Sequence, residues 1–337
     1  MCSTIARAVL VAVGLLCLAL WLGAAIGETS IPLDVVAKTV ANRLFHAGYP
    51  LDAIDEGIIW NYRLSRAVVA ACCGAALALS GVVLQALLRN PLADPYILGI
   101  SAGASTGAVG VAILGFGAGV LTMPLGAFLG ALTAFALVSL LALRAGSGNS
   151  AIILAGVAGS QLFNAITSFI VTKAANAEQA RGIMFWLLGN LSGVRWPDVW
   201  LALPVAVFGL AVCLWHARAL DAFTFGSSSA ASLGIQVRRV FIILTGICAL
   251  MTAVMVSIVG SIGFVGLVIP HAARMVVGVR HRRLLPAAAL TGAIFMIGAD
   301  IVSRTIITGQ VLPIGVITAL FGAPAFALIL SQKRRAA

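Results

Sequence analysis

The chain has 337 residues, of which 61% are hydrophobic and only 9% carry a charge, and its mean hydropathy is +1.12. A soluble domain usually has about a quarter charged residues, so this composition excludes an ordinary soluble enzyme or binding module. A helix needs about 20 apolar residues to cross a bilayer, and the apolar stretches suffice for about ten such helices. We therefore expect an all-α polytopic membrane protein with one transmembrane domain over residues 1–337.

Ten apolar stretches follow one another along the chain. They cover residues 5–26, 58–88, 92–113, 119–143, 150–172, 198–215, 238–259, 262–279, 284–307 and 311–331. The first has Arg7, an apolar core and small residues near its end, as a signal peptide would. The many later stretches favour a retained first helix, and ten spans place both termini on the same side of the membrane.

The distribution of Lys and Arg predicts which side faces the cytoplasm. Thirteen of the 21 basic residues fall on one side with two acidic residues, which leaves a net charge of +11 there, whereas eight basic and eight acidic residues balance on the other side. Short cytoplasmic loops are enriched in Lys and Arg. Both termini are therefore expected in the cytoplasm, and the basic excess gives no reason to expect a nucleic-acid partner.

Two connections between the spans are long. Residues 27–57 form the outer, periplasmic one. Its stretch "IPLDVVAKTVANRLF" has apolar residues at helical spacing, which predicts an amphipathic helix on the membrane surface or on the bundle. These residues are Ile31, Val35, Val36, Val40 and Leu44. Residues 220–239 form the longest cytoplasmic loop, in which Asp221 is expected to cap a short helix that ends near Gly234.

Cysteine and histidine do not form a metal or redox motif. Five of the six cysteines lie inside apolar stretches, and the four histidines are scattered without an HExxH or CxxC pattern. We expect no metal site and no catalytic centre in this chain.

The stretch "LRNPLADPYILGISAGAS", residues 88–105, interrupts two apolar spans on the cytoplasmic side. Pro91 and Pro95 cannot continue a helix, so a polar turn is expected between them. Such turns are tolerated at membrane depth only inside protein or beside water. A turn at a pore mouth would fit, but the composition alone favours an ordinary short loop. Residues 260–293 have a similar plan, which allows a diverged internal repeat.

Three long stretches together resemble a known family. "GVVLQALLRNPLADPYILGISAGAS", "GSIGFVGLVIPHAAR" and "LPIGVITALFGAPAFALIL" are similar to the FecCD family, in the right order and at the right spacing from about residue 60 to 331. This family consists of the permease subunits of bacterial ABC importers for ferric siderophores, haem and cobalamin. The resemblance implies a bundle like that of the vitamin B12 permeases, a type II ABC importer.

The resemblance also implies the partners. The chain would work as a homodimer with a second copy of itself in the bacterial inner membrane. Each copy would sit on one subunit of a cytoplasmic ATPase dimer, and a periplasmic binding protein would deliver the chelate. The sequence has no GxxxxGK[ST] phosphate loop. ATP and Mg²⁺ would therefore be bound by the partner ATPase, and this chain would hold no cofactor and catalyse no reaction.

Matching positions carry over the roles of family residues. Arg63, Arg66 and Arg304 match arginines that dock acidic residues of the binding protein. Arginine suits this role because its planar fork pairs with carboxylates at two points. The competing interpretation is interfacial snorkelling, or for Arg304 a pair with Asp300 four residues earlier.

The cytoplasmic gate, the pathway and the coupling segment are carried over in the same way. Gate positions are matched by Asn90, Leu92, Asn149 and Ser150, although Asn149 replaces the family's threonine. The fifth span would line the pathway with Gly156, Gly159, Ser160 and Asn164. The segment that seats in the ATPase would include Asp221, Gly226, Ser227, Ser228, Ser229, Leu233 and Gly234. Family members often have acidic residues where this chain has the three serines.

The cargo is expected to be an iron chelate, a ferric siderophore or haem, because "RNPLADPYILG" resembles that branch slightly more than the cobalamin branch. Cobalamin is the alternative. A stand-alone secondary transporter would need ionisable groups inside its spans, and Asp300 is the nearest candidate. A membrane enzyme would need a cluster of His, Cys or carboxylate side chains, and the sequence shows none.

Overall fold

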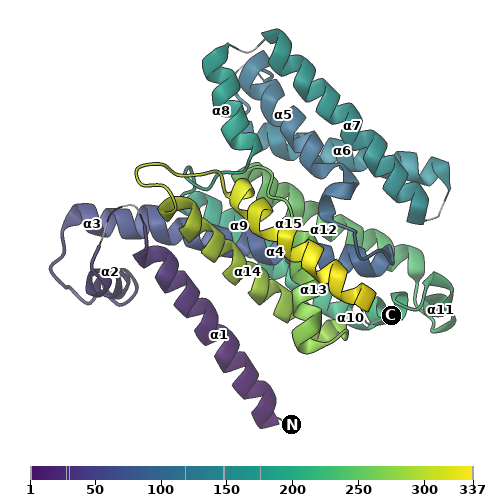
Figure 1. The fold of residues 1–337 in the computed structure, drawn as a ribbon, viewed down its shortest axis with the longest axis horizontal. Coiled ribbons are helices and arrows are strands. Elements are labelled where there is room, and N and C mark those ends of the chain that lie inside the picture. Colours follow the sequence, from purple (N-terminus) through teal and green to yellow (C-terminus); the bar gives the residue numbers. More distant parts are fainter. Residues whose placement is uncertain are drawn as a thin grey trace.

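The computed structural model of the chain describes residues 2–27, 29, 31–117, 119–146, 149–174 and 176–335, which form helices joined by loops (Figure 1). The helices are α1 (Cys2–Ala25), α2 (Leu33–Phe45), α3 (Ala53–Gly57), the π-helix η1 (Ile58–Leu64), α4 (Ser65–Leu87), the 3₁₀-helix η2 (Pro95–Leu98), α5 (Ile100–Leu114), α6 (Met123–Ala145), α7 (Asn149–Ala174), α8 (Ala177–Leu187), α9 (Trp196–Trp215), α10 (Ala217–Phe223), α11 (Ser227–Ser232), α12 (Val237–Val259), α13 (Val265–Val277), α14 (His281–Thr305) and α15 (Ile314–Arg335).

The predicted all-α fold is confirmed, with a helix at each of the ten predicted apolar stretches. Within the described residues, six helical stretches are long and apolar enough to cross a membrane: Ala53–Leu87, Met123–Ala145, Ser150–Lys173, Trp196–Trp215, Val237–Val259 and His281–Thr305. Four shorter apolar helices are Leu10–Ala25, Ile100–Leu114, Val265–Val277 and Ile314–Leu328. Together these correspond to the ten stretches expected from hydropathy, and the all-α fold class follows.

The structure differs from the prediction in three places. The stretch 92–113 is split at Gly99, which has a left-handed φ of 76° between η2 and α5. Residues 260–264 are not helical, so α13 begins only at Val265. Helix α8 was not predicted, although its start carries a capping box in which Asn176 and Gln179 bond each other's backbone N–H groups.

Helix α4 lies at the centre of the bundle. Nearly all of its residues are buried, and α9, α12, α13 and α14 pack around it. Helices α5, α6, α7 and α8 gather on one side of this group, while α2 and α11 lie toward opposite ends of the molecule (Figure 1). The loops expected in the periplasm and those expected in the cytoplasm therefore lie at different ends of the bundle.

Glycines allow α4 to contact its neighbours through the backbone. A Cβ on Gly74 would lie 2.0 Å from the carbonyl O of Gly292 in α14, and one on Gly81 would lie 1.9 Å from the carbonyl O of Gly266 in α13. No larger residue fits at these crossings. Apolar side chains gain nothing by leaving lipid for a neighbouring helix, so this close approach is a main source of attraction between membrane helices.

Helices α5 and α6 pack by the same device, with a GxxxG pattern on each. A Cβ on Gly103 would lie 2.4 Å from the carbonyl O of Gly130, and one on Gly107 would lie 2.0 Å from that of Gly126. The paired patterns fix the crossing point of the two helices.

We predict that Gly81→Ala separates α4 from α13 and lowers the free energy of unfolding by about 3 kcal/mol, because the added methyl meets backbone. The matched control is Gly246→Ala in α12, where a Cβ has no neighbour within 4 Å. It should be neutral or slightly stabilising, since Ala is the better helix former. Thermal unfolding of both variants in detergent checks this, and equal melting temperatures would contradict the packing argument.

Candidate functional site

The three stretches singled out in the sequence meet at the non-helical residues 260–264. The hydroxyl of Tyr96 in η2 accepts from the N–H of Ile262 at 2.9 Å and donates to its carbonyl at 3.0 Å. The hydroxyls of Ser101 and Ser261 lie 2.7 Å apart. The turn after α4 is therefore bonded directly to the break between α12 and α13.

The third stretch joins the same break. A Cβ on Gly315 would lie 2.2 Å from the carbonyl O of Leu188 and 3.1 Å from that of Ser261, and one on Gly322 would lie 2.5 Å from the Phe264 side chain. Phe264 itself has a left-handed φ of 69°. Irregular backbone at membrane depth needs protein around it, and these contacts supply it.

The predicted gate turn is a compact polar turn. The carboxamide oxygen of Asn90 accepts from the N–H of Leu92 at 2.9 Å, and its carbonyl accepts from the N–H of Ala93 at 3.0 Å. Asp94 then caps η2 by accepting from the N–H of Tyr96 at 2.8 Å. The Leu92 side chain is 49% exposed. The turn is held by its own bonds, with an exposed apolar tip.

The second gate pair lies at the start of α7. Ser150 is exposed, and the side chain of Asn149 lies outside what the structure describes. Helix α7 packs on η2 six residues later, where a Cβ on Gly156 would lie 1.7 Å from the carbonyl O of Ile97. Helix α7, which begins with the second gate pair, thus contacts η2, which directly follows the first.

The predicted pathway residues on α7 lie on different faces. Gly156 is buried against η2, and a Cβ on Gly159 would lie 2.6 Å from the Val138 side chain of α6. Ser160 is half-buried beside Gly99, while Asn164 is exposed. The two glycines serve helix packing in this arrangement. A pathway-lining role stays a prediction, and of the four residues Asn164 is the accessible one.

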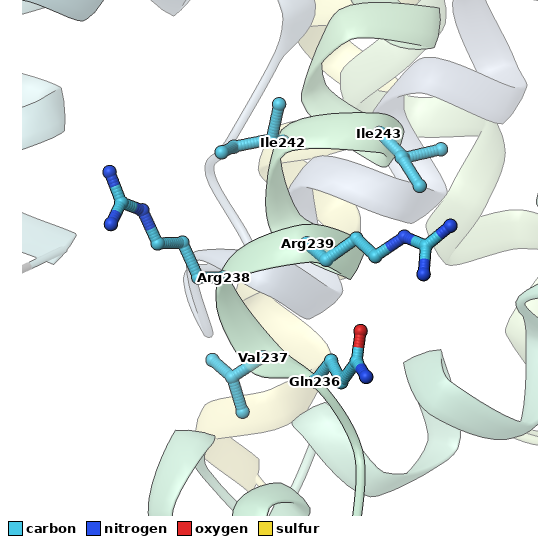
Figure 2. A pocket seen from close by; sticks show the side chains of 6 residues that line it. All are labelled: Gln236, Val237, Arg238, Arg239, Ile242 and Ile243. Carbon is cyan, nitrogen blue, oxygen red and sulfur yellow. The ribbon is translucent and has the colours of Figure 1, made fainter.

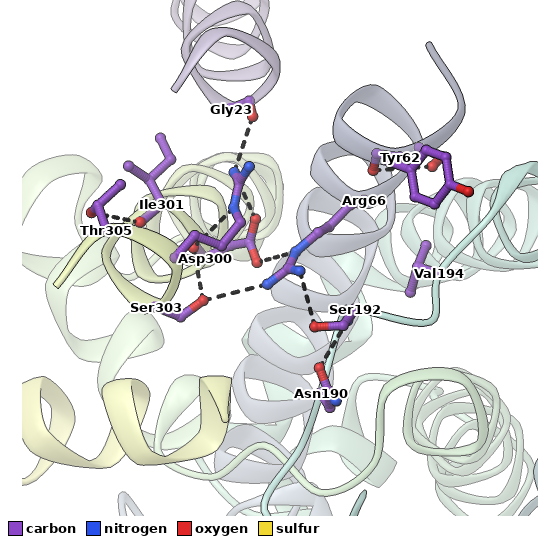
Figure 3. Close-up of polar contacts among 12 residues, drawn as sticks. Gly23, Tyr62, Arg66, Asn190, Ser192, Val194, Asp300, Ile301, Ser303 and Thr305 are labelled. Carbon is purple, nitrogen blue, oxygen red and sulfur yellow. Dashed lines mark hydrogen bonds and ion pairs between the residues drawn. The ribbon is translucent and has the colours of Figure 1, made fainter. Parts of the chain in front are cut away.

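A buried ionic network lies near the opposite end of the bundle (Figure 3). Nε of Arg66 lies 2.6 Å from Oδ1 of Asp300, and Nη2 of Arg304 lies 2.9 Å from Oδ2. Arg66 also donates to the hydroxyls of Ser192 at 3.2 Å and Ser303 at 3.4 Å. One fully buried carboxylate thus joins α4 to α14, and Arg66 connects both to the loop before α9.

Backbone carbonyls accept further hydrogen bonds from the guanidinium groups. Arg63 donates to the carbonyl of Ala25 at 2.9 Å and to that of Thr29, and Arg304 donates to the carbonyl of Gly23 at 3.0 Å. The three predicted docking arginines are only 5% to 8% exposed. Docking needs guanidinium groups that a partner can reach, and these are committed to contacts inside the chain. The docking role stays a prediction.

The predicted cap by Asp221 is wrong. Its Oδ1 accepts from the backbone N–H of His281 at 2.9 Å and lies 2.7 Å from Nδ1 of the same residue. The carboxylate therefore satisfies the first N–H of α14 rather than a helix in its own loop. Gly226, with a φ of 108°, stands at the N-cap of α11 instead, without a side-chain cap.

The short helix expected in the cytoplasmic loop is α11, and its predicted end is confirmed. Gly234 has a left-handed φ of 80°, and its N–H donates to the carbonyl of Ala231 at 2.9 Å, which ends the helix. Phe225 and Leu233 flank α11 and are 77% and 72% exposed. Ser227, Ser228 and Ser229 are exposed as well. The segment presents an apolar and hydroxyl-bearing surface at one end of the molecule.

Two further arginines follow at the start of α12. Figure 2 shows Arg238 and Arg239 pointing to opposite sides of the helix, near Ile242 and Ile243. Both are exposed, and within the described residues neither makes a hydrogen bond or an ion pair. Exposed arginine beside apolar side chains is typical of the boundary between lipid and water.

Sequence reasoning missed two contacts. Arg66 and Asp300 are 234 residues apart, and Asp221 and His281 are 60 apart, so no local spacing reveals either pair. Only Arg304 had a signal, its helical spacing from Asp300. Within the described chain, no three His, Cys, Asp or Glu side chains gather as a metal site requires.

Comparison with known proteins agrees with this arrangement. The model of the FecCD transport family matches residues 15–332. The cobalamin import permease BtuC of Halobacterium salinarum is 45% identical, over 92% of this chain and 88% of that protein. The ferric dicitrate permease FecD of Escherichia coli is 37% identical, over 82% and 86%. A solved metal-chelate type ABC transporter in an inward-facing conformation matches with a TM-score of 0.84 and 30% identity, over 97% and 99%. The chain belongs to the FecCD transport family of ABC permeases.

Proposed function

We propose that this chain forms, with a second copy of itself, the membrane pathway of an ATP-driven importer for a bulky metal chelate. A cytoplasmic ATPase dimer would drive it, and a periplasmic binding protein would load it. The observation that carries the proposal is the position of α10 and α11. Their segment projects at one end of the bundle, and Arg89, which directly precedes the gate turn, lies beside Gly226. Motion of a partner bound to α11 can reach the gate there.

The charge distribution supports the orientation. The end that bears the gate turn, α11 and the basic start of α12 would face the cytoplasm, with both termini on that side. The end that bears α2, α3 and the buried ionic network would face the periplasm and receive the binding protein. Ile31, just before α2, and Val36 within it pack there.

A second copy would cover apolar surface that one copy leaves open. On α7, Leu154 and Phe169 are both 69% exposed, and on α15, Leu320 is 61% exposed. Lipid covers such side chains as readily as protein does, so the pairing rests mainly on the family. It would place Asn164 near the pathway between the copies.

The cargo is the least specified part of the proposal. An iron chelate is the first candidate, from the resemblance of the turn after α4. Cobalamin is the second, because the cobalamin permease of H. salinarum shares 45% of its residues with this chain and the ferric dicitrate permease of E. coli shares 37%. A secondary transporter has little support, since Asp300, its best coupling group, is paired with two arginines.

Purification of the tagged chain from native membranes, followed by mass spectrometry, tests the assembly. We expect a Walker-type ATPase in equal amount and a binding protein encoded beside it. Proteoliposomes that contain all three should take up one labelled chelate with ATP hydrolysis. Uptake of cobalamin but of no iron chelate would select the second candidate. Uptake by the chain alone would contradict the proposal.

We predict that Phe225→Asp abolishes association with the ATPase while the bundle stays folded, because it places a charge in the apolar contact. Phe45→Asp is the matched control, since Phe45 is 78% exposed at the opposite end. Pull-down of the ATPase from detergent extracts measures the effect. Equal recovery with both variants would show that α11 does not seat in the ATPase.

We predict that Arg66→Gln weakens docking of the binding protein and also lowers the free energy of unfolding by about 3 kcal/mol, because a buried carboxylate loses a partner. Lys38→Gln removes an exposed pair with Asp34 near the same end and should leave the melting temperature nearly unchanged. Melting temperatures and binding-protein titrations check both variants. Weaker docking at unchanged stability would show instead that Arg66 contacts the binding protein directly.

A further inference from the structure

A cavity of about 220 Å³ lies between the gate turn and the coupling segment. Four parts of the chain line it: Gln85 and Arg89 from the end of α4, Thr224 between α10 and α11, Arg274 from α13, and His281 from α14. Residues from α13, α14, the end of α4 and the loop before α11 thus surround one small space.

Arg89, Arg274 and His281 give the cavity a basic character. The guanidinium groups of Arg89 and Arg274 make no hydrogen bond or ion pair with any described residue, although the backbone of each is bonded, and Arg274 is half-buried. The nearby carboxylate of Asp221 is already bonded to the backbone and ring of His281. Two guanidinium groups therefore adjoin the space without an acidic partner from the described part of the chain.

The side-chain oxygen of Gln85 is a buried acceptor to which no described group donates a hydrogen bond. The residue is 5% exposed, and its amide nitrogen donates to the carbonyls of Gly266 at 3.3 Å and Leu267 at 3.4 Å. Its Oε1 has no hydrogen-bond partner within the described residues. A buried acceptor without a donor costs free energy, and a guanidinium drawn into the cavity would satisfy it.

We infer that this cavity binds an acidic side chain of the ATPase subunit, held by Arg89 and Arg274. The inference rests on the proposed function and deepens it. The planar guanidinium fork pairs with a carboxylate at two points, and two guanidinium groups beside one cavity can both donate to a single carboxylate. The mouth of the cavity includes Thr224, one residue before the exposed Phe225, so it continues the surface proposed to seat the ATPase.

A lipid headgroup is the weaker occupant. The surface that suits lipid is the start of α12, where Arg238 and Arg239 stand beside isoleucine side chains (Figure 2). The cavity is lined by Ala86, Pro91 and Val279 as well, but its polar groups come from the ends of α4, α13 and α14 and from the loop before α11. Its positive charge favours a carboxylate presented from the direction of α11.

The consequence is a second link from the ATPase to the gate. Arg89 directly precedes Asn90, has a left-handed φ of 48°, and places Nη1 3.3 Å from where a Cβ on Gly226 would stand. A left-handed φ is unfavourable for a residue other than glycine and needs support from its surroundings. A carboxylate that pulls on Arg89 acts on the gate turn itself, in addition to motion carried by α11.

The test titrates the ATPase into the full-length permease in phosphatidylcholine nanodiscs, with and without phosphatidylglycerol. We expect Arg89→Gln combined with Arg274→Gln to weaken binding about 30-fold, as loss of a desolvated charge pair does. Arg238→Gln is the control, an exposed arginine outside the cavity, and should leave binding unchanged. Arg89→Gly, which relieves the left-handed backbone, should weaken binding like Arg89→Gln. Thermal unfolding confirms that each variant is folded.

A photo-crosslinking residue at position 224 identifies the occupant. A cross-link to an ATPase peptide with Asp or Glu, and rescue of Arg89→Glu by an Arg at that acidic position, would support the inference. Unchanged affinity of the double variant would overturn it, and an effect seen only with phosphatidylglycerol would assign the cavity to lipid. If the unaltered chain binds no ATPase, the proposed function fails as a whole. If the unaltered chain binds the ATPase and the double variant binds it equally well, the inference about the cavity fails while the proposed function stands.

Discussion

Close backbone contact between helices is the constraint on which the rest of this structure depends. In a membrane, apolar side chains gain nothing by leaving lipid for a neighbouring helix, so the helices are held where small residues let their backbones touch. Gly81 against Gly266 brings α13 onto α4. That contact fixes the break at residues 260–264, on which the turn after α4 and the start of α15 both converge. The polar turn is stable at this depth because packed protein surrounds it.

Polar interactions then fasten the two ends of the bundle in different ways. At one end, Asp300 is fully buried between Arg66 and Arg304. Removal of either arginine would deprive this buried carboxylate of a partner for its charge. At the other end, Asp221 is 41% exposed and bonds only the start of α14. The ionic contact at the first end is therefore buried, whereas the one at the second end is partly open to solvent.

Hydropathy and charge predicted the spans well because each span is a local property of the chain. The prolines at 91 and 95 likewise indicated the turn, and the glycine at 234 indicated the end of α11. Contacts between distant residues had no such signal. The sequence shows many glycines, but it does not show that Gly81 meets Gly266 or that Arg66 meets Asp300. Arginines that match a docking motif can be buried supports, and only the packing reveals which they are.

Arg89 connects the turn after α4 to the start of α11. A gate turn that moves must be bonded within itself, so that it shifts as a unit, and must be attached to what drives it. Asn90 supplies the internal bonds by accepting from Leu92 and Ala93. Arg89 supplies the attachment, because its backbone ends α4 while its side chain reaches the N-cap of α11. Gly226 admits that side chain, since its left-handed backbone and missing Cβ leave room where any other residue would crowd it. The predicted gate turn and the segment proposed to seat the ATPase are thus in contact within this chain.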